Sequence, residues 1–367
     1  MKKTQDDCKS DFQPYKLDNG TGIGSHIEKT ERKKRQTIKA SDFLDKHLSR
    51  KGIARVDTCH DYMRFLTDKD FDKKRLDKAN SCGNRFCPIC SWKKSKKDAI
   101  KISTITSALQ DKIGVKFLFL TLTSPNVSAE ELADEIKALN LAFSKMFKRD
   151  RIKKAVLGYV RKLEVTTDQN PIITEELYKR KKKYFANRGL KVGDDNPQYN
   201  TYNPHFHCIL VVKRGYFGKH YIKQDEWLNM WREAKNDTTI TQVKVTAVKN
   251  LEDNAEEVTS NPILEIAKYT AKDSDLFTNQ DVFDTLYLAL KGRQLLVYSG
   301  EFKNYAKMYD NGELDEYKYK EEVKYVYFIR TTWNGTEYEA KLKRLTKEEF
   351  EEVNGDLEGY SLADETG

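Results

Sequence analysis

Two histidines flank a phenylalanine at the start of an apolar run, in the segment 205–212 with the sequence HFHCILVV. The run predicts a β-strand, in which alternate side chains point to opposite faces. His205 and His207 then project together, while Phe206 faces the core. Two adjacent imidazoles can bind a divalent metal ion such as Mn²⁺. A His-x-His pair is weak evidence by itself, because many such pairs are incidental.

A metal site needs a third ligand, and Glu164 is the candidate. It lies in the segment 159–166, YVRKLEVT, whose alternation of polar and apolar residues predicts a second strand. Glu164 shares a face with Lys162, so pairing of the two strands would put its carboxylate beside the histidines. A glutamate on the solvated face of a strand is the alternative interpretation.

A second group of reactive side chains lies on a helix that is expected to start after Pro262. Glu265, Tyr269 and Lys272 are spaced i, i+4 and i+7, so they share one stripe of that helix. A tyrosine oxygen can attack a DNA phosphate that a metal ion polarises. A nearby lysine can neutralise the developing charge, and a carboxylate one turn away can deprotonate a water molecule. An ordinary amphipathic helix with exposed charges is the alternative.

Cysteines form the third group. Cys82, Cys87 and Cys90 follow one another with the spacing Cys-x4-Cys-x2-Cys, and Cys59 lies upstream next to His60. Structural zinc is bound tetrahedrally by four cysteine or histidine side chains, and Cys-x2-Cys spacing is typical of such sites. The cluster therefore predicts a zinc site rather than free thiols or disulfides. Either Cys59 or His60 could be the fourth ligand.

The composition favours a polyanion as partner. The formal net charge is +9, with 38% hydrophobic and 34% charged residues, and cationic side chains bind nucleic acid by releasing its counterions. The basic run 32–35 could contact DNA, although such a run is more often simply solvated. No apolar stretch approaches the roughly 20 residues of a membrane span, and the N-terminus lacks the apolar run of a secretion signal. We therefore expect a cytoplasmic protein, with Cys8 and Cys208 as free thiols.

The polar and apolar patterns predict an α+β fold. We expect strands at 117–123 and 243–248, and a helix bearing Trp227 and Trp231 on one side. Ser128 and Glu131 have the spacing of a capping box, which predicts a helix from Ser128 to about residue 148.

Four parts are expected along the chain. Residues 1–50 are polar and are predicted to be disordered, and residues 51–105 form the zinc-binding module. Residues 106–305 form the catalytic domain, with a polar insertion at 168–203. Residues 306–367 form a tyrosine-rich segment that ends in a solvated acidic tail.

The order of these motifs resembles that of the rolling-circle plasmid replication initiators, in the branch of the HUH endonuclease superfamily with one catalytic tyrosine and a partner glutamate. The resemblance covers residues 55 to 305. The motifs that carry it are Leu120–Thr123, Glu164–Thr166, Pro204–His207 and Glu265-x3-Tyr269-x2-Lys272. Supporting marks are the segment CPICSW at 87–92, the helix with Trp227 and Trp231, Gly292 and the segment 298–300.

The resemblance implies both a mechanism and a fold. His205 and His207 would bind the catalytic ion, Mn²⁺ or Mg²⁺, with Glu164 as our choice of third ligand. Tyr269 would form a 5′-phosphotyrosine with nicked DNA and free a 3′-hydroxyl for priming, and Glu265 would activate water in the closing step. The fold would be an antiparallel sheet with helices packed on it and the metal on the open face. The implied partners are plasmid origin DNA, double-stranded and single-stranded, and the host replicative helicase and polymerase.

Two rival functions remain at this point. An HUH transposase or relaxase shares the histidine pair and a tyrosine helix, but the cysteine module and Glu265 favour the initiator. A zinc-containing DNA-binding regulator without catalytic activity would explain the charge and the cysteines. It would leave the joint occurrence of the histidines, Glu265 and Tyr269 without a reason.

Overall fold

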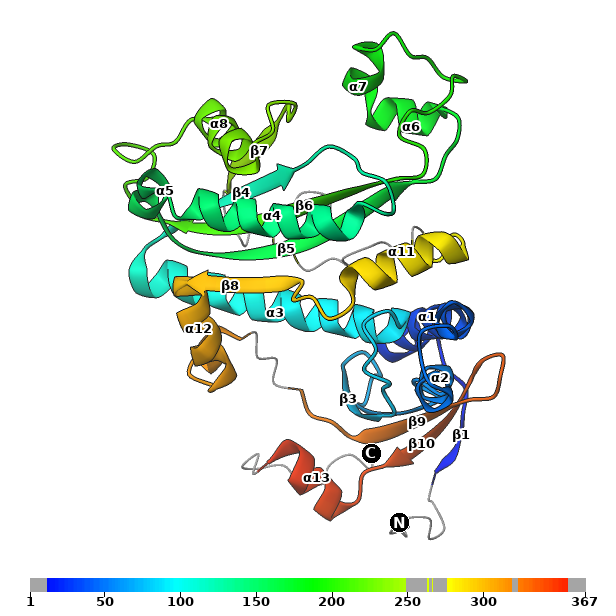
Figure 1. Ribbon diagram of the computed structural model, residues 1–367. Helices are drawn as coiled ribbons and strands as arrows, with labels where there is room; N and C mark the ends of the chain where they lie inside the picture. Colours follow the sequence, from blue (N-terminus) through cyan, green and yellow to red (C-terminus); the bar gives the residue numbers. More distant parts are fainter. Residues whose placement is uncertain (1–11, 249–262, 264–265, 267–275, 319–322, 356–367) are drawn as a thin grey trace. The chain divides into compact units, whose positions relative to one another are not determined.

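A computed structural model describes residues 12–248, 263, 266, 276–318 and 323–355 (Figure 1). The chain forms two compact units. Unit 1 combines residues 1–93 with residues 320–367, and unit 2 comprises residues 94–319. The C-terminal part of the chain therefore joins the N-terminal part in one folding unit, whereas the sequence pattern had suggested separate consecutive parts.

Unit 1 contains a five-stranded antiparallel sheet. Its order is β1 (Gln13–Tyr15), β10 (Tyr338–Arg344), β9 (Tyr327–Trp333), β2 (Tyr62–Thr67) and β3 (Lys74–Ala79). Strand β9, near the end of the chain, pairs with β2, near its beginning, so neither half of unit 1 can complete the sheet without the other.

The predicted disorder of residues 1–50 is wrong for much of that segment. Residues 22–44 form helix α1 (Gly22–Leu44), which is followed by α2 (Arg50–Asp57). Ile23 and Ile27 are buried against the sheet with Met63 and Ile329. The buried positions recur at helical spacing, but a lysine and several threonines occupy some of them, so the segment looks polar in the sequence.

The acidic segment from Glu348 is likewise not a solvated tail throughout. Residues Lys347–Asn354 form helix α13, which begins with a reciprocal capping box between Thr346 and Glu349. Phe350 of this helix is buried with Leu66, Phe328 and Leu345. A single buried aromatic side chain among many charges fixes this helix to unit 1, and the acidic composition conceals it.

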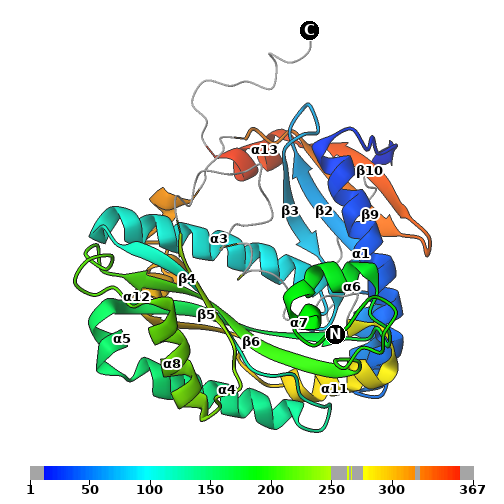
Figure 2. The same ribbon diagram turned by 90° about the horizontal axis from the view of Figure 1, so that it is seen from above.

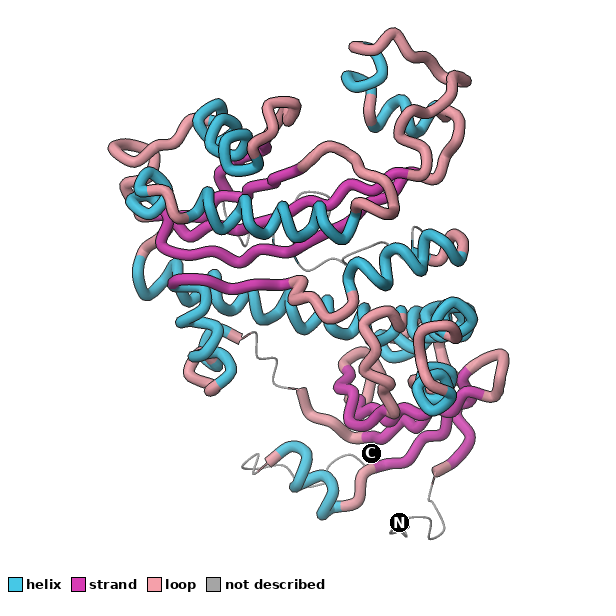
Figure 3. Tube along the Cα trace, viewed as in Figure 1, coloured by secondary structure: helices cyan, strands magenta, loops and turns pink. Residues whose placement is uncertain are grey.

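Unit 2 contains the second five-stranded sheet, and the strands are coloured magenta in Figure 3. Its order is β7 (Val243–Val248), β4 (Lys116–Thr123), β6 (Thr201–Val212), β5 (Val156–Asp168) and β8 (Leu296–Gly300), with all neighbours antiparallel. The four strands predicted from the sequence are present, and each has the predicted bounds or is a few residues longer. The α+β prediction is confirmed.

Helices pack on both faces of this sheet (Figure 2). On one face lies α4 (Leu132–Phe147), whose Phe143 ring contacts Phe206 edge-on at 5.4 Å. On the other face, residues of α3 (Pro88–Ile113) and α12 (Glu301–Asp310) form a core with Phe119 and Ile209. The other helices among the described residues of unit 2 are α5 (Asp150–Ala155), α6 (Glu175–Arg180), α7 (Lys182–Ala186), α8 (Gln224–Lys235), α11 (Gln280–Leu290) and the 3-10 turn Asp315–Tyr317.

Helix α4 begins later than the sequence pattern predicts. The Ser128 N–H donates to the Glu131 carboxylate at 3.0 Å, but this bond closes a turn that precedes the helix. Trp227 and Trp231 are fully buried on one side of α8, as predicted. Among the described residues, no helix has the length and apolarity to cross a membrane.

The insertion between β5 and β6 is a folded element rather than a loop. The two strands pair without interruption to Asp168 and Thr201, and the insertion forms α6 and α7 at the tip of this hairpin (Figure 1). Ile173, Leu177 and Phe185 form a small buried core of its own. Its high content of charged residues concealed these few apolar positions.

Candidate metal centres

The register of the unit 2 sheet brings the predicted metal ligands together. Glu164 of β5 lies opposite His205 of β6, and His207 lies two residues further along the same face. The Glu164 Oε2 atom is 3.2 Å from His207 Nε2 and 3.7 Å from His205 Nε2. All three ligand atoms lie within 4.8 Å of one another. Two imidazole nitrogens and one carboxylate oxygen at this spacing can bind a single divalent ion.

Both imidazoles are oriented by contacts at their other nitrogen. His205 Nδ1 lies 3.1 Å from the carbonyl oxygen of Asn203, to which it can donate. His207 Nδ1 lies 3.2 Å from the hydroxyl of Thr121, and the His207 ring stacks on Phe119 at 5.5 Å. Metal-binding histidines are commonly held in this way, because the bond at one nitrogen sets the tautomer and leaves the other nitrogen for the ion.

The ligand residues are more enclosed than the expected open face. Glu164, His205 and His207 are only 8%, 8% and 9% exposed. Low exposure strengthens electrostatic interactions within the site, because water screens them less.

Lys162 is a further charged residue beside these ligands, and we did not assign it a role from the sequence. It lies opposite His207 in the strand register and is 7% exposed. Burial lowers the pKa of its ammonium group, while Asp98 acts in the opposite direction. Its position two residues before Glu164, on the same face of the strand, is the sequence feature that could have indicated such a role. A cation here suits a site that receives an anion.

The helical residues Glu265, Tyr269 and Lys272 lie outside the described residues. Ile263 and Ile266, which flank Glu265, are described and are 5% and 0% exposed. Both belong to the core that contains Phe119 and Ile209. Those residues share the sheet face of the histidines, since Phe119 lies opposite Ile209 and side chains two residues apart on a strand share a face. Ile263 and Ile266 therefore pack on the face that carries the candidate ligands.

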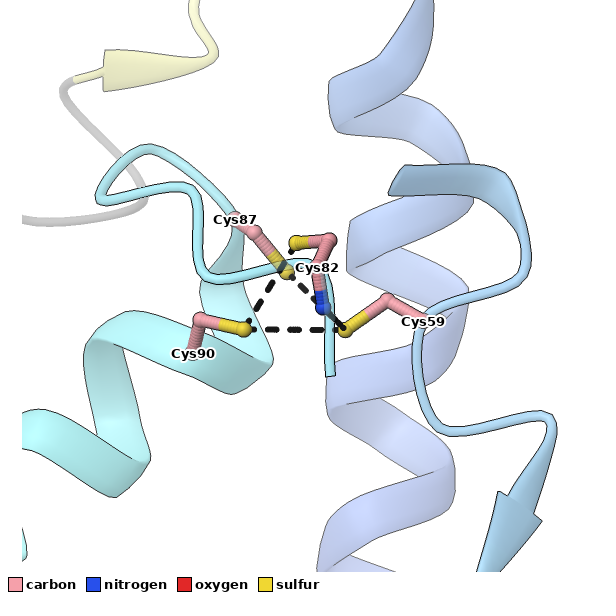
Figure 4. A group of neighbouring side chains, drawn as sticks. All are labelled: Cys59, Cys82, Cys87 and Cys90. Carbon is pink, nitrogen blue, oxygen red and sulfur yellow. Dashed lines mark hydrogen bonds between the residues drawn. The ribbon is translucent and has the colours of Figure 1, made fainter. Parts of the chain in front are cut away.

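Four cysteine sulfurs converge in unit 1 (Figure 4). Cys59 and Cys82 each lie 3.6 Å from Cys90, and Cys87 lies 3.7 Å from Cys59, measured between Sγ atoms. Sulfurs bound 2.3 Å from one tetrahedral ion lie about 3.8 Å apart, so these separations fit a single ion. Of the two candidates for the fourth ligand, the structure brings Cys59 and not His60 into the group.

The cysteine sulfurs accept hydrogen bonds from backbone N–H groups. Cys82 donates to Cys59 Sγ at 3.4 Å, Gly83 to Cys90 Sγ at 3.3 Å and Asn84 to Cys82 Sγ at 3.5 Å. The pKa of the Cys90 thiol is lowered by hydrogen bonds from Cys59, Cys82 and Cys87, with a smaller contribution from Gly83. The pKa of the Cys59 thiol is raised by hydrogen bonds with the other three cysteines and by burial. Thiolates are the metal-binding form of cysteine, and the three backbone donors stabilise that form. Cys208 is a free, buried thiol, as predicted.

A buried lysine holds the loop that carries Cys59. Lys34 of α1 has no exposed surface, and its ammonium group bonds the carbonyl oxygens of Asp57 and Cys59 and pairs with Asp61 at 2.6 Å. The basic run 32–35 is therefore not uniformly solvated. Its third residue is a structural part of the cysteine site.

The chain is similar to known replication proteins. A family model described as "Replication protein" matches residues 73–339. A "Protein rep" of Staphylococcus aureus is 37% identical over 257 residues, 70% of this chain and 97% of that protein. A "Protein rep" of Bacillus amyloliquefaciens is 30% identical over 82% of this chain and 87% of that protein, and one of Streptococcus pneumoniae is 32% identical over 71% and 75%. No solved structure matches significantly.

The matched region contains most of the residues considered above. Residues 73–339 include the three ligands of unit 2, the segment around Tyr269 and three of the four cysteines.

Proposed function

This chain belongs to the replication protein family, as a rolling-circle plasmid replication initiator, and we propose that it nicks one strand of the origin with Tyr269 as nucleophile. The matches with replication proteins favour an initiator over a transposase or relaxase. The observation that carries the proposal is the convergence of Glu164, His205 and His207 on a face that also anchors Ile266. Tyr269 follows Ile266 by three residues, so its Cα lies within about 11 Å of the Ile266 Cα.

Each residue has a distinct part in the proposed reaction. A divalent ion, Mn²⁺ or Mg²⁺, held by Glu164, His205 and His207 would polarise the scissile phosphate and position it. The Tyr269 oxygen attacks the phosphorus, the bond to the 3′ oxygen breaks, and the 5′ phosphate remains on the tyrosine. The released 3′ oxygen takes a proton and becomes the primer for the host polymerase, while the host helicase opens the duplex. Lys272 neutralises charge on the phosphate.

Termination requires a second cleavage. With one tyrosine, water is the available nucleophile, and Glu265 precedes Tyr269 by four residues, the spacing of one turn on the helix predicted from the sequence. Its carboxylate would take a proton from that water, whose oxygen then attacks a phosphate at the same site. The bond from this phosphorus to the 3′ oxygen would break, and the released 3′ oxygen would take up a proton.

The cysteine cluster has a structural part in this proposal. Cys59, Cys82, Cys87 and Cys90 would bind one zinc ion, and four protein ligands leave no coordination position for a substrate. The four cysteines belong to unit 1, whereas Glu164, His205 and His207 belong to unit 2. This assignment supports a bracing role for the cysteines rather than a catalytic one.

Mass mapping of a covalent adduct tests the proposal. The full-length protein is incubated with Mn²⁺ and a single-stranded oligonucleotide that spans the origin nick site, then digested and sequenced. We expect Tyr269 to carry the 5′ phosphate of the fragment downstream of the nick, and no adduct with Tyr269→Phe, which removes only the hydroxyl. An adduct on another tyrosine would reassign the nucleophile. Binding of supercoiled origin plasmid without any nicking would favour the regulator.

A further inference from the structure

The insertion at the tip of the β5–β6 hairpin is built as a small rigid module. Its core of Ile173, Leu177 and Phe185 is extended by Tyr178, which stacks on Phe185 at 5.9 Å, and by Tyr184. The module is fixed to the strands by hydrogen bonds at its base, among them the bond from the Asn200 N–H to the Asp168 carbonyl at 2.7 Å. It therefore has a defined position relative to the two strands that carry Glu164, His205 and His207.

The surface of this module is strongly basic. Seven of the 13 residues from 179 to 191 are lysine or arginine, and none is acidic. Lys181 turns inward and pairs with Asp168 at 2.9 Å. The other six are exposed and form no ion pair with any described residue: Lys179, Arg180, Lys182, Lys183, Arg188 and Lys191.

Some cations on other helices of the chain have acidic partners. On α1 and α4, for example, cations are paired with acidic neighbours one turn away, as in Arg35 with Glu31 and Lys137 with Asp134. Like charges that are close together repel one another unless a counter-charge is supplied. Exposed carboxylates are also present in the module, at Glu175, Glu176, Asp194 and Asp195, but lysine and arginine outnumber them. A folded core with six cations that have no ion-pair partner among the described residues therefore fits a polyanionic partner.

The position of the module favours DNA as that partner. Glu164 and Asp168 are four residues apart on β5, about 13 Å at 3.3 Å per residue. Duplex DNA carries about one negative charge per 1.7 Å of axis, so a duplex leading from the metal site would present about eight charges over that length. The position of the module gives no such argument for an acidic protein as the partner.

The aromatic residues favour duplex over single-stranded DNA. Proteins that bind single strands stack bases on exposed aromatic rings. In this module Tyr178, Tyr184 and Phe185 are engaged with one another, and the Arg188 guanidinium covers the Tyr184 ring at 3.9 Å. Tyr199, 49% exposed, is the one exposed aromatic ring among residues 169–200. The exposed charged groups of residues 179–191 are ammonium and guanidinium ions, which contact phosphates irrespective of base sequence.

We propose that residues 169–200 form a clamp on the phosphate backbone of the origin duplex beside the nick site. This inference rests on the proposed function, because it assumes that origin DNA is bound at the metal ligands. The clamp would hold the duplex while the tyrosine acts on the strand at the metal site. It would contribute affinity and salt dependence rather than chemistry.

The experiment measures the affinity of the full-length protein for an origin duplex at several salt concentrations. The test variant is Lys179→Gln with Lys183→Gln. The matched control is Lys303→Gln with Lys307→Gln, which removes two exposed lysines at the same spacing on α12. A Lys179→Arg, Lys183→Arg variant keeps the charge.

We expect the slope of log K against log salt to become less negative by about 1.8 in the test variant, at about 0.9 for each lost duplex contact. If the affinities converge at 1 M salt, this corresponds to a loss of about 60-fold at 0.1 M. The α12 control and the arginine variant should match the wild type. Nicking of a single-stranded oligonucleotide in Mn²⁺ should remain within about twofold.

Two outcomes would overturn the clamp. One is a test variant that has the same stability as the wild type and also the same salt slope and the same affinity for the duplex. The other is a loss of oligonucleotide nicking as large as the loss of duplex binding, which would assign the module to the reaction itself. Failure of the wild type to nick would contradict the proposed function, whereas the slopes are binding measurements and remain interpretable.

Discussion

At the scale of single residues, the proposed chemistry depends on three ligand atoms from two adjacent strands. Their positions follow from one register, in which Glu164 lies opposite His205. The outer contacts then determine which nitrogen of each imidazole is available, through Asn203 and Thr121. The site can therefore be tested separately at the ligands and at the residues that orient them.

His207→Ala should reduce nicking of supercoiled origin plasmid in Mn²⁺ by on the order of 10³-fold, because the phosphate is no longer polarised and positioned. Duplex binding should be nearly unchanged, since cationic contacts elsewhere supply most of the affinity. The control is Thr121→Val, which removes only the orienting hydroxyl and should reduce nicking by about 10-fold to 100-fold. Wild-type nicking by His207→Ala would rule out the histidine as a ligand.

Glu265→Ala should separate initiation from termination. The variant should still nick and form the phosphotyrosine adduct, because Tyr269 and the metal ligands are retained. It should fail in the second cleavage, since no carboxylate is available to deprotonate water. In replication of a template with two origins, we expect products that run past the second origin. Clean termination there would reduce Glu265 to a surface residue.

The purified protein should contain about one zinc ion per chain by elemental analysis. A Cys87→Ser, Cys90→Ser double variant should lose it, because both sulfurs belong to the group of four. His60→Ala should keep the ion, since His60 is not among the convergent ligand atoms. Zinc content unchanged in the double variant would place the ion elsewhere.

At the scale of secondary-structure elements, local patterns predicted what local interactions determine. The apolar runs 117–123 and 205–212 and the alternation at 159–166 correspond to β4, β6 and β5. Helix α1 could not be predicted in this way, because its buried face includes Lys34 and its partners are supplied by distant segments. In a sequence, a lysine is expected to be solvated unless the groups that bind its ammonium ion are known.

Lys34→Met tests whether α1 supports the cysteine site. The substitution keeps an unbranched side chain but leaves two buried carbonyl groups without their donor. We expect unit 1 to lose about 2–3 kcal/mol of unfolding free energy, together with weaker zinc retention against a chelator. Lys39→Met, at an exposed position of the same helix, is the matched control and should change neither. Equal zinc retention in both variants would mean that Lys34 contributes to packing but does not support the cysteine site.

At the scale of the whole molecule, the pairing of distant segments decides the architecture. Strand β2 lies between β3, its neighbour in sequence, and β9, which is more than two hundred residues away. No periodicity within either segment specifies this pairing, because each strand pattern fits any antiparallel partner. The sequence pattern therefore suggested four consecutive parts, whereas the two chain ends form one unit around the cysteine cluster.

Truncation after residue 319 tests this interleaved unit. It removes β9, β10 and α13, so β1 loses its partner and β2 keeps only β3. It also removes two contacts to the loop after Cys59: the Trp333 N–H donates to the Asp61 carbonyl at 2.8 Å, and the Tyr338 hydroxyl donates to the His60 carbonyl at 2.9 Å. Loss of the sheet and of these contacts should expose the cysteine loop to solvent.

We expect the truncated protein to release its zinc readily and to be cleaved by protease within residues 12–93, while a fragment close to 94–319 survives. Truncation after Gly355 is the control, because it leaves every described strand and helix of unit 1 in place. It should retain zinc and protease resistance. If the shorter truncation also retains both, the cysteine site is held by the N-terminal segments alone, and β9 merely covers them.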